Sequence, residues 1–301
     1  MPDASLSGEI QRMARQAGAV AVGFAPADEV DQAHWSAFRR FIEQGRHFTM
    51  AWLENYPEIR RNPLKLFTPE ATQGTVISLA FPYRHHDANP LFAAYAQGGD
   101  YHRVLRKLLR PIARHITEAT GARSRVCVDS APILERYWAM RAGIGHIGLN
   151  HNLIVPGAGS YVLLAEIVTE AVRPSAAPTG ESPCDSCRAC LRACPHGALS
   201  ADGTFDAALC QSCLTIEHRG QLEITLEGPA IYGCDLCLKA CPANRTTAPG
   251  LPVFAPRDDI RTLTRQALAH LTPQEYTRIF ADTAITRCPL PQLLRNLHSS
   301  K

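Results

Sequence analysis

Two runs of cysteines in the centre of the chain limit what it can fold into more than any other feature. Two residues between successive cysteines let one tight turn present thiolates to neighbouring irons, as in bacterial two-cluster ferredoxins. The first run has the full spacing of that motif, Cys184-x2-Cys187-x2-Cys190-x3-Cys194-Pro195. The second run repeats it without its first cysteine, Cys234-x2-Cys237-x3-Cys241-Pro242, and Cys210 or Cys213 can supply the missing ligand. These eight thiolates are enough for two [4Fe–4S] clusters.

The two runs are expected to share their clusters. In this motif the fourth cysteine of each run binds the other cluster, and the proline after it ends the ligand loop. Structural zinc and disulfides are the alternatives, but zinc sites are usually closed by paired C-x2-C hooks and need no pair of longer runs. We therefore predict one cluster on Cys184, Cys187, Cys190 and Cys241, and a second on Cys194, Cys234, Cys237 and either Cys210 or Cys213.

Length and composition describe a chain that can bury a core. For 301 residues we expect one large domain or two to three small ones, and 46% of the residues are hydrophobic. The net charge of +3 is below the level that by itself signals nucleic-acid binding. No basic-then-apolar signal begins the sequence, and no apolar run approaches the roughly 18 residues of a membrane span. Eleven cysteines in such a chain are expected to be reduced thiols and metal ligands, so we predict a cytoplasmic protein without a membrane segment.

Three segments follow one another along the chain. Residues 1–172 alternate helical and strand-like patterns, which is typical of an α/β domain. Residues 173–250 comprise a linker at 173–183, rich in Pro, Ser and Ala, and the cluster module. Residues 251–301 are expected to end in helix, with a capping box made by Thr272 and Glu275. In the first segment we expect helices at 5–18, 32–45, 50–56 and 102–120, with a kink at Pro111, and strands at 19–25, 75–83, 125–129 and 161–170.

Three closely spaced glycines, Gly143, Gly145 and Gly148, match the G-x-G-x-x-G pattern of dinucleotide-binding folds. The pattern does not directly follow a clear strand, as that fingerprint requires, so it is a weak indication of nicotinamide binding. Glycines at this spacing also permit tight turns and a close approach of the backbone to a flat or bulky ligand.

Three features of the sequence are specific in combination: VDSAPILER at 128–136, IYGCD at 231–235 and the cysteine frame. On these features the chain resembles the epoxyqueuosine reductase (QueG) family over nearly its whole length, and in particular the short form of that family. The place of Cys210 before LTIE matches the family and favours it over Cys213 as the eighth ligand. Other shared motifs are AYAQGGDYH at 94–102, RAGIGHIG at 141–148, GSYVLLAEI at 159–167, CLTIE at 213–217, and FADTAITR with LLRN between 280 and 296.

The resemblance implies a fold and a reaction. The fold is an α/β corrinoid-binding domain, related to the B12-processing and reductive dehalogenase group, with a ferredoxin-like module of two [4Fe–4S] clusters and short C-terminal helices. The reaction is the cobalamin-dependent two-electron reduction of epoxyqueuosine in tRNA to queuosine. Low-potential clusters can reduce the cobalt of the cofactor, which carries the difficult chemistry. The implied partners are tRNA carrying epoxyqueuosine and a low-potential electron donor of the ferredoxin or flavodoxin type, and we expect a monomer.

One acidic residue is implied in catalysis. The opened epoxide oxygen must be protonated, and the family pattern places the proton donor at Asp129. A general acid that works near neutral pH needs a raised pKa, and a site closed by a corrinoid can raise it by desolvation. From composition alone, a cap or turn residue ahead of Pro132 is the favoured explanation of Asp129.

Further residues match cofactor-contacting positions of the family. Without the resemblance, the arginines among them are explained as surface charges and the leucines as core residues. The chain departs from the family at His146, Leu149 and Ala243, where Trp, Lys and Trp are usual. The matching positions are Arg60, Leu153, Leu164, Ser212, Arg219 and Asp235.

Two other functions compete with this interpretation. A related corrinoid reductase of a small substrate, such as an organohalide, shares the cofactors but not the VDSAPILER and LTIE motifs. A non-enzymatic electron carrier needs no α/β domain of the size of residues 1–172. Basic residues recur at helical spacing in 102–120, and they form either a tRNA-binding face or a solvated helix surface: Arg103, Arg106, Lys107, Arg110 and Arg114.

Overall fold

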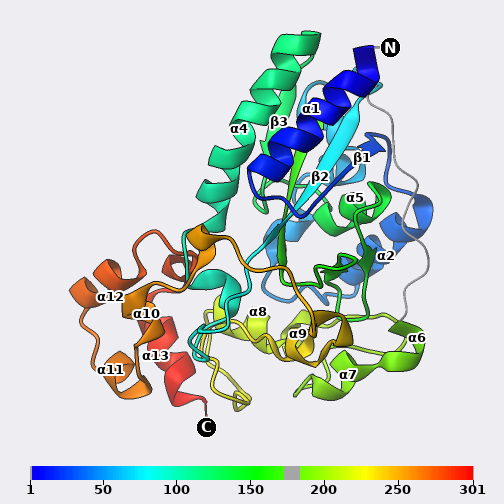
Figure 1. The fold of residues 1–301 in the computed structure, drawn as a ribbon. Coiled ribbons are helices and arrows are strands. Elements are labelled where there is room, and N and C mark those ends of the chain that lie inside the picture. Colours follow the sequence, from blue (N-terminus) through cyan, green and yellow to red (C-terminus); the bar gives the residue numbers. More distant parts are fainter. Residues whose placement is uncertain (1, 173–183, 301) are drawn as a thin grey trace.

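A four-stranded antiparallel sheet forms the centre of the N-terminal half (Figure 1). The computed structural model describes residues 2–172 and 184–300, so the linker expected at 173–183 lies outside the described residues. The strands follow the order β1-β2-β6-β3, with β2 and β6 in the middle. Their bounds are Ala21–Pro26 for β1, Thr75–Pro82 for β2, Ser124–Cys127 for β3 and Val162–Thr169 for β6.

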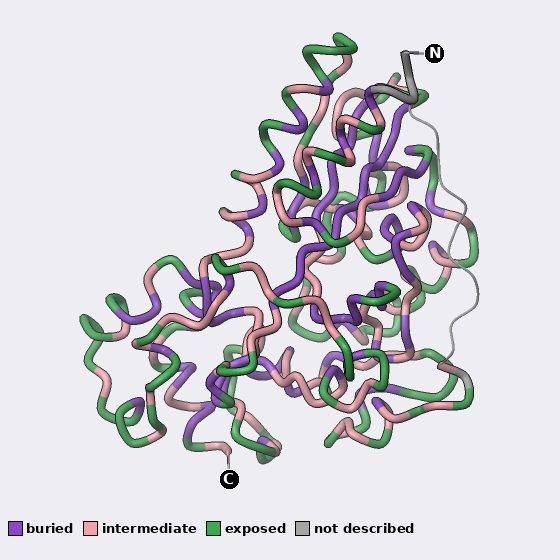
Figure 2. The backbone as a smooth tube through the Cα atoms, in the orientation of Figure 1, coloured by how far each residue is buried: buried purple, intermediate pink, exposed green. Residues whose placement is uncertain are grey.

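Helices cover both faces of this sheet, as Figure 1 shows. On one face pack α1 (Pro2–Gln16) and α4 (Tyr101–Thr120), and on the other α2 (Gln32–Glu43) and α5 (Glu135–Arg141). Because side chains alternate along a strand, Ile77 of β2 joins the core under α1 and α4, whereas its neighbour Val76 joins the core under α2 and α5. The sheet is accordingly buried on both sides (Figure 2). The predicted α/β domain is confirmed, with small shifts at the ends of its elements.

Two expected helices differ in detail from the prediction. The helix expected at 50–56 is only a short 3₁₀ helix, η1 (Ala51–Glu54), followed by α3 (Pro57–Arg61). The reason is Pro57, which disfavours helical geometry at the residue before it, and Tyr56 has a left-handed φ of 56°. Helix α4 continues on both sides of Pro111, although proline removes one N–H from its hydrogen-bond ladder. Two more short 3₁₀ helices are η2 (Pro63–Leu66) and η3 (Ala94–Ala96).

A small hairpin was not expected from the sequence. Strands β4 (His146–Ile147) and β5 (Leu153–Ile154) pair next to α5. The glycine pattern explains why the chain can pack here, since a Cβ on Gly145 would lie 2.5 Å from the carbonyl oxygen of Ile154. At this position, close backbone approach therefore serves the protein's own hairpin.

The cysteine-rich segment lies below the sheet in the view of Figure 1 and consists of short helices joined by turns. This arrangement places the cysteines in or next to helices of only a few residues. In chain order the elements are α6 (Cys184–Cys187), α7 (Ala189–Ala193), η4 (Ala207–Leu209), α8 (Gln211–Ile216), α9 (Leu236–Ala240) and η5 (Pro242–Asn244).

The C-terminal segment is helical and shares a core with the segment around Phe92 and with Tyr232. The predicted capping box is confirmed, because Thr272 Oγ1 accepts from the Glu275 N–H and Glu275 Oε2 accepts from the Thr272 N–H. The domain boundaries at 172 and 250 stay a prediction. The elements are η6 (Pro252–Phe254), α10 (Asp258–Arg261), α11 (Arg265–Ala269), α12 (Pro273–Phe280), η7 (Ala284–Arg287) and α13 (Leu290–His298).

Candidate functional site

Four cysteines from both runs lie together at the periphery of the molecule. Burial and the nearby charges of Cys184 and Cys241 raise the pKa of Cys190. Burial and the charges of Cys184 and Cys187 raise the pKa of Cys241. A cavity is lined by all four, with Leu149 and Ile154 from the hairpin region. We call this set the outer group: Cys184, Cys187, Cys190 and Cys241.

A second set of four lies closer to the sheet, around α8 and α9 (Figure 1). Burial, followed by the charges of Cys210 and Cys194, raises the pKa of Cys234 to about 11. Burial and the charge of Cys234 raise the pKa of Cys237 to about 12, and Cys210 and Cys194 add to this. We call this set the inner group: Cys194, Cys210, Cys234 and Cys237. The outer group thus takes three cysteines from the first run and Cys241 from the second, whereas the inner group takes Cys194 from the first run, two cysteines from the second and Cys210 from between them.

The structure distinguishes Cys210 from its neighbour Cys213. The Cys210 thiol lies near Cys194 and accepts backbone N–H bonds from Ser212 and Cys213. The buried Cys213 thiol instead hydrogen-bonds the Thr49 side chain, and Cys210 is the one cysteine whose charge raises its pKa. The geometry therefore favours Cys210 as the fourth member of the inner group.

In neither group do the side chains converge on the position of a single metal ion. Within residues 2–172 and 184–300, no three His, Cys, Asp or Glu side chains are arranged to hold a single metal ion. Tetrahedral zinc would require sulfurs at about 2.3 Å from one ion. Backbone N–H groups point at several of the sulfurs, for example the Ala198 N–H at 3.3 Å from Cys194 Sγ. Donors of this kind stabilise thiolates and tune iron–sulfur clusters, so the residues fit two such clusters.

Asp129 follows β3 in an unusual backbone conformation. Its φ of 55° is left-handed, which is uncommon for a residue other than glycine and recurs at functional sites. The turn is held by the Asp129 N–H, which donates to Glu135 Oε1 at 2.5 Å, and by the Ser130 N–H, which donates to the Val128 carbonyl at 2.6 Å. The carboxylate stays 44% exposed, so this turn presents it to solvent.

The Asp129 carboxylate joins a chain of polar groups from the start of α4. Its Oδ2 accepts from the Tyr101 hydroxyl at 2.7 Å and lies 2.8 Å from Nε2 of the buried His102. The other ring nitrogen, Nδ1, lies 2.7 Å from Asp100 Oδ1. Because both ring nitrogens face carboxylate oxygens, a doubly protonated imidazolium satisfies both contacts.

These contacts set the protonation of the site. Burial raises the pKa of Asp129, but the hydrogen bonds from His102 and Tyr101 and the nearby Arg287 more than offset it, so the net shift is downward. The rise expected for the Asp129 pKa refers to a site closed by a corrinoid and stays a prediction, whereas in the protein alone the pKa is lowered. Burial lowers the pKa of His102, but the hydrogen bonds with Asp100 and Asp129 outweigh it and raise the pKa overall. The raised pKa of His102 and the lowered pKa of Asp129 together favour a protonated imidazole beside an ionised carboxylate.

Behind the Asp129 turn lies a pair of carboxyl groups. Glu166 is fully buried in the middle of β6, its neighbour is the Glu135 carboxyl, and its oxygens receive no hydrogen bond of normal length from the described residues. Burial and the charge of Asp129 raise the pKa of Glu135 to about 8, and burial raises that of Glu166 well above its ordinary value. At least one of the two is protonated near neutral pH.

Sequence reasoning had assigned no role to several of these residues. Tyr101 and His102 lie in the motif at 94–102, and Arg287, with Nη1 at 3.9 Å from Asp129 Oδ2, lies in the motif starting at Phe280. Both motifs were recognised as shared, which was the available signal. What brings them to Asp129 is tertiary packing, because the C-terminal segment folds back onto the start of α4.

The expected cofactor residue Arg60 is buried rather than a solvated surface charge. Its side chain donates to the carbonyls of Asn55 and Trp52, both at 3.0 Å. This bonding supports a segment that carries exposed aromatic rings, Trp52 at 45% and Tyr56 at 60%. The nearby Phe48 contacts the ring of His218, which follows the end of α8, with 5.1 Å between the ring centroids. Exposed aromatic rings of this kind offer apolar surface to a flat ligand.

The other expected cofactor residues are divided between two places. Leu153 is buried and Leu164 half-buried in one small core beside α5. Ser212 is half-buried next to Cys210, and the exposed Arg219 donates to the Arg287 carbonyl at 2.9 Å. Asp235 accepts the Ala94 N–H at 2.8 Å, next to Cys234. Three of the five therefore surround the inner group and the Asp129 side of the molecule.

Comparisons with known proteins agree with this arrangement. The family model described as "Epoxyqueuosine reductase QueG, DUF1730" matches residues 60–130, and the "4Fe-4S double cluster binding domain" model matches residues 183–244. The epoxyqueuosine reductases of Synechococcus sp. (strain RCC307) and Gloeobacter violaceus are each 33% identical, over 98% and 99% of this chain and 93% and 96% of theirs. The structure of epoxyqueuosine reductase from Streptococcus thermophilus superposes with a TM-score of 0.85 at 30% identity, covering 97% of this chain and 79% of that one. An epoxyqueuosine reductase crystallised with a tRNA-Tyr epoxyqueuosine-modified stem loop gives 0.83 at 29% identity, covering 97% and 80%.

An α/β domain joined to a double [4Fe–4S] module defines an oxidoreductase of the iron–sulfur class. Identity of 33% along nearly the whole chain is specific enough to define the family as well. The chain belongs to the epoxyqueuosine reductase family.

Proposed function

We propose that this chain reduces epoxyqueuosine in tRNA to queuosine, with cobalamin and two [4Fe–4S] clusters as cofactors. Removal of the epoxide oxygen consumes two electrons and two protons and releases water. The observation that carries the proposal is the position of Asp129, His102 and Arg287 on the same side of the molecule as the inner cysteine group. A site of this kind combines an electron path with a proton source.

The cysteine geometry supports two clusters in series. The outer group is the proposed ligand set of one cluster and the inner group, with Cys210, that of the other. Because each set takes one cysteine from the opposite run, the two clusters are held close together, as electron transfer requires. Electrons are proposed to enter at the outer cluster and leave from the inner one.

Asp129 is the proposed proton donor to the opened oxygen. In the protein alone the pKa of its carboxyl group is lowered, so it is proposed to act together with His102, whose pKa is raised and whose Nε2 lies 2.8 Å from Asp129 Oδ2. Asp100 fixes the ring from the other side at 2.7 Å. Tyr101 orients the same carboxylate oxygen through its hydroxyl.

The exposed rings near Arg60 fit a corrinoid. We propose that Arg60, Leu153, Leu164, Ser212, Arg219 and Asp235 help to hold the cofactor. When bound, cobalamin supplies the two-electron reduction chemistry that side chains lack. The protein's own contributions are binding, orientation and the exclusion of water.

The implied partners are tRNA carrying epoxyqueuosine and a low-potential donor of the ferredoxin or flavodoxin type. We propose a monomer in the cytoplasm. In the part of the chain that the structure describes, no helix is long and apolar enough to cross a membrane.

Anaerobic turnover tests the function directly. Reconstituted protein is mixed with cobalamin, a low-potential reductant and epoxyqueuosine-containing tRNA, and the nucleosides are quantified by mass spectrometry. Queuosine that forms only with cobalamin supports the proposal. If protein with intact clusters and bound corrinoid forms no product, its substrate is a different compound.

A further inference from the structure

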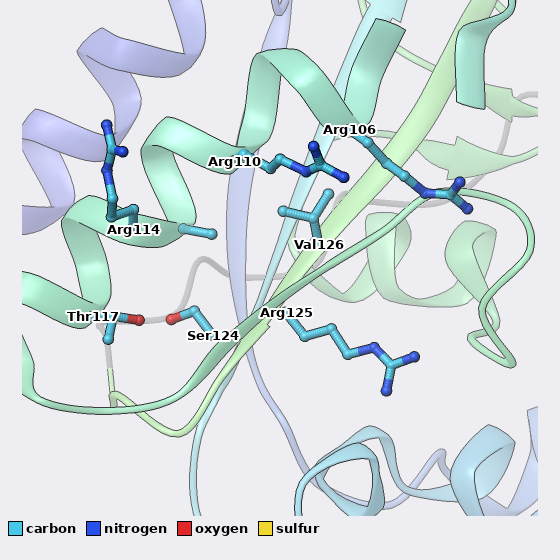
Figure 3. A pocket seen from close by; sticks show the side chains of 8 residues that line it. Arg106, Arg110, Arg114, Thr117, Ser124, Arg125 and Val126 are labelled. Atoms are coloured by element: carbon cyan, nitrogen blue, oxygen red, sulfur yellow. The ribbon is translucent and has the colours of Figure 1, made fainter. Parts of the chain in front are cut away.

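A groove rich in arginine runs along the junction of α4 and β3. Its volume is about 450 Å³, and its walls come from one face of α4 and from the edge strand β3. Figure 3 shows that the side chains of Arg106, Arg110 and Arg125 extend to one side of this junction, whereas Arg114 points away from them. The lining residues are Arg106, Arg110, Ala113, Arg114, Thr117, Ser124, Arg125 and Val126.

Two of these arginines, Arg110 and Arg125, are exposed. Within residues 2–172 and 184–300, neither makes a side-chain hydrogen bond or ion pair. Arg114 is 74% exposed and has only a 3.7 Å contact with Glu118 of its own helix. Three guanidinium groups extend to one side of the junction, those of Arg106, Arg110 and Arg125, and none of them pairs with a carboxylate among the described residues. This leaves a local excess of positive charge.

The groove is continuous with the Asp129 turn. Arg106 donates from Nη2 to the Ser130 hydroxyl, and Ser130 directly follows Asp129. From there Arg110 and Arg114 follow at intervals of four residues, about 6 Å along the helix axis. The Arg110 side chain extends to the same side as that of Arg106, so positive charge continues from the Asp129 turn into the groove.

The basic face foreseen from the sequence is therefore divided. Arg103 forms an ion pair with Asp282 at 2.7 Å. Lys107 does not line the groove. Arg125, from another element, takes their place. Protection of the β3 edge by charge would explain exposed arginines as well, but it would not require them to lead to Asp129.

We propose that this groove binds the phosphate backbone of the substrate RNA and guides it to the Asp129 turn. The inference rests on the proposed function, because tRNA is the polyanion that must reach that turn. Guanidinium groups suit phosphates through paired N–H donors, and such contacts position an RNA without reading its sequence. Arg110 and Arg125 are the residues that carry the contact.

RNA binding tests the groove without any need for turnover. The affinity of the reconstituted holoenzyme for a fluorescent, unmodified tRNA-Tyr stem loop is measured by anisotropy across a series of salt concentrations. The double variant Arg110→Ala/Arg125→Ala is expected to raise Kd at least about tenfold at about 0.15 M salt and to lower the salt slope by about two. Arg110→Lys/Arg125→Lys, which keeps the charge, is expected to recover most of the affinity.

A matched control removes the same charge on the opposite face of the sheet. Arg39→Ala/Arg40→Ala alters two exposed arginines of α2 and is expected to leave Kd and the salt slope unchanged. An equal loss in this control, unchanged affinity of the Arg110/Arg125 variant, or no binding by the wild type would overturn the proposal. Because the RNA is unmodified, failure of queuosine formation leaves this measurement intact.

Discussion

The outer and inner cysteine groups share a motif but differ in their surroundings. The outer group lies at the periphery among α6, α7 and the hairpin, and its cavity is completed by Leu149 and Ile154 (Figure 1). The inner group lies beneath the sheet, close to α8, from whose end Glu217 reaches the Asp129 site. The described groups of the Asp129 site therefore lie on the inner side. We propose that electrons enter from the outer end of the module and meet protons at the inner end.

The positions where the chain departs from its family fall on the outer side. Leu149 lines the outer cavity, the Ala243 N–H donates to Cys241, and His146 pairs with Ile154 in the hairpin. None of the three appears in the Asp129 network. The departures expected from the sequence therefore lie around the outer cysteine group and outside the described Asp129 network.

The largest effect is expected from removing a ligand of either group. Cys210→Ser is expected to halve the iron content from about eight to about four and to abolish queuosine formation. Cys187→Ser is expected to halve the iron as well, yet to retain measurable turnover with a small chemical reductant that can reach the inner cluster. Iron analysis and product quantification on the two variants check this contrast.

Cys213→Ser is the matched control for Cys210→Ser, because the two thiols are neighbours on α8 and only Cys210 lies near Cys194. It is expected to keep about eight irons. Equal loss of iron in both serine variants, or full turnover in Cys210→Ser, would break the assignment of the inner group.

The next largest effect is expected at Asp129. Asp129→Asn keeps the shape and the backbone turn but removes the proton relay, so turnover is expected to fall about 10²–10⁴-fold while iron and cobalamin are retained. Product formation under anaerobic conditions measures this. Asp202→Asn, an exposed loop change, serves as the control, and wild-type turnover of Asp129→Asn would exclude its role as acid.

A smaller effect is expected from pH. The pKa of His102 is raised above 6.5, so its proton is present at lower pH and is lost as the pH rises through that raised value. Turnover is therefore expected to decline on the alkaline side. In His102→Gln the overall rate is expected to be lower and this decline absent, as a pH–rate profile would reveal. If the variant shows the same decline in turnover at alkaline pH as the wild type, a group other than His102 causes the decline.

The smallest effect is expected in stability, at the Glu135–Glu166 pair. The pKa of Glu166 is raised in the folded protein above its ordinary 4.5, so the folded state binds more protons than the unfolded state above that pH. The free energy of unfolding is then expected to fall as the pH rises from about 4.5 towards the folded pKa, by at most about 1.4 kcal/mol per pH unit and proton. Glu166→Gln is expected to flatten this slope in thermal unfolding followed by circular dichroism. Glu43→Gln, on the surface of α2, should keep the wild-type slope.

The sequence predicted best those features that depend on residues close together in the chain. The cysteine runs, the α/β alternation and the Thr272 capping box depend on residues a few positions apart, and periodicity or ligand geometry is enough to predict them. The β4–β5 hairpin escaped prediction because each strand has only two residues, too few for any alternation to be visible.

The site itself was predicted only in part. Asp129 was named, but its lowered pKa depends on His102 and Arg287, which the fold brings from distant positions. The arginines of α4 were noticed on one helix, whereas the groove needs Arg125 from the adjacent strand. Contacts between elements of this kind leave no periodic trace in a single sequence.

The exchange of one cysteine between the two runs has a consequence for how the chain matures. In the proposed ligand sets, the inner cluster is completed by Cys237 and the outer by Cys241, only a few residues later. A ribosome must therefore release almost the whole module before either cluster can be closed, and the two then close nearly together. Each cluster would connect segments of the module that are far apart in sequence and would reduce the conformational entropy of the chain between them. Loading of iron and sulfur is therefore expected to be a late, concerted folding step.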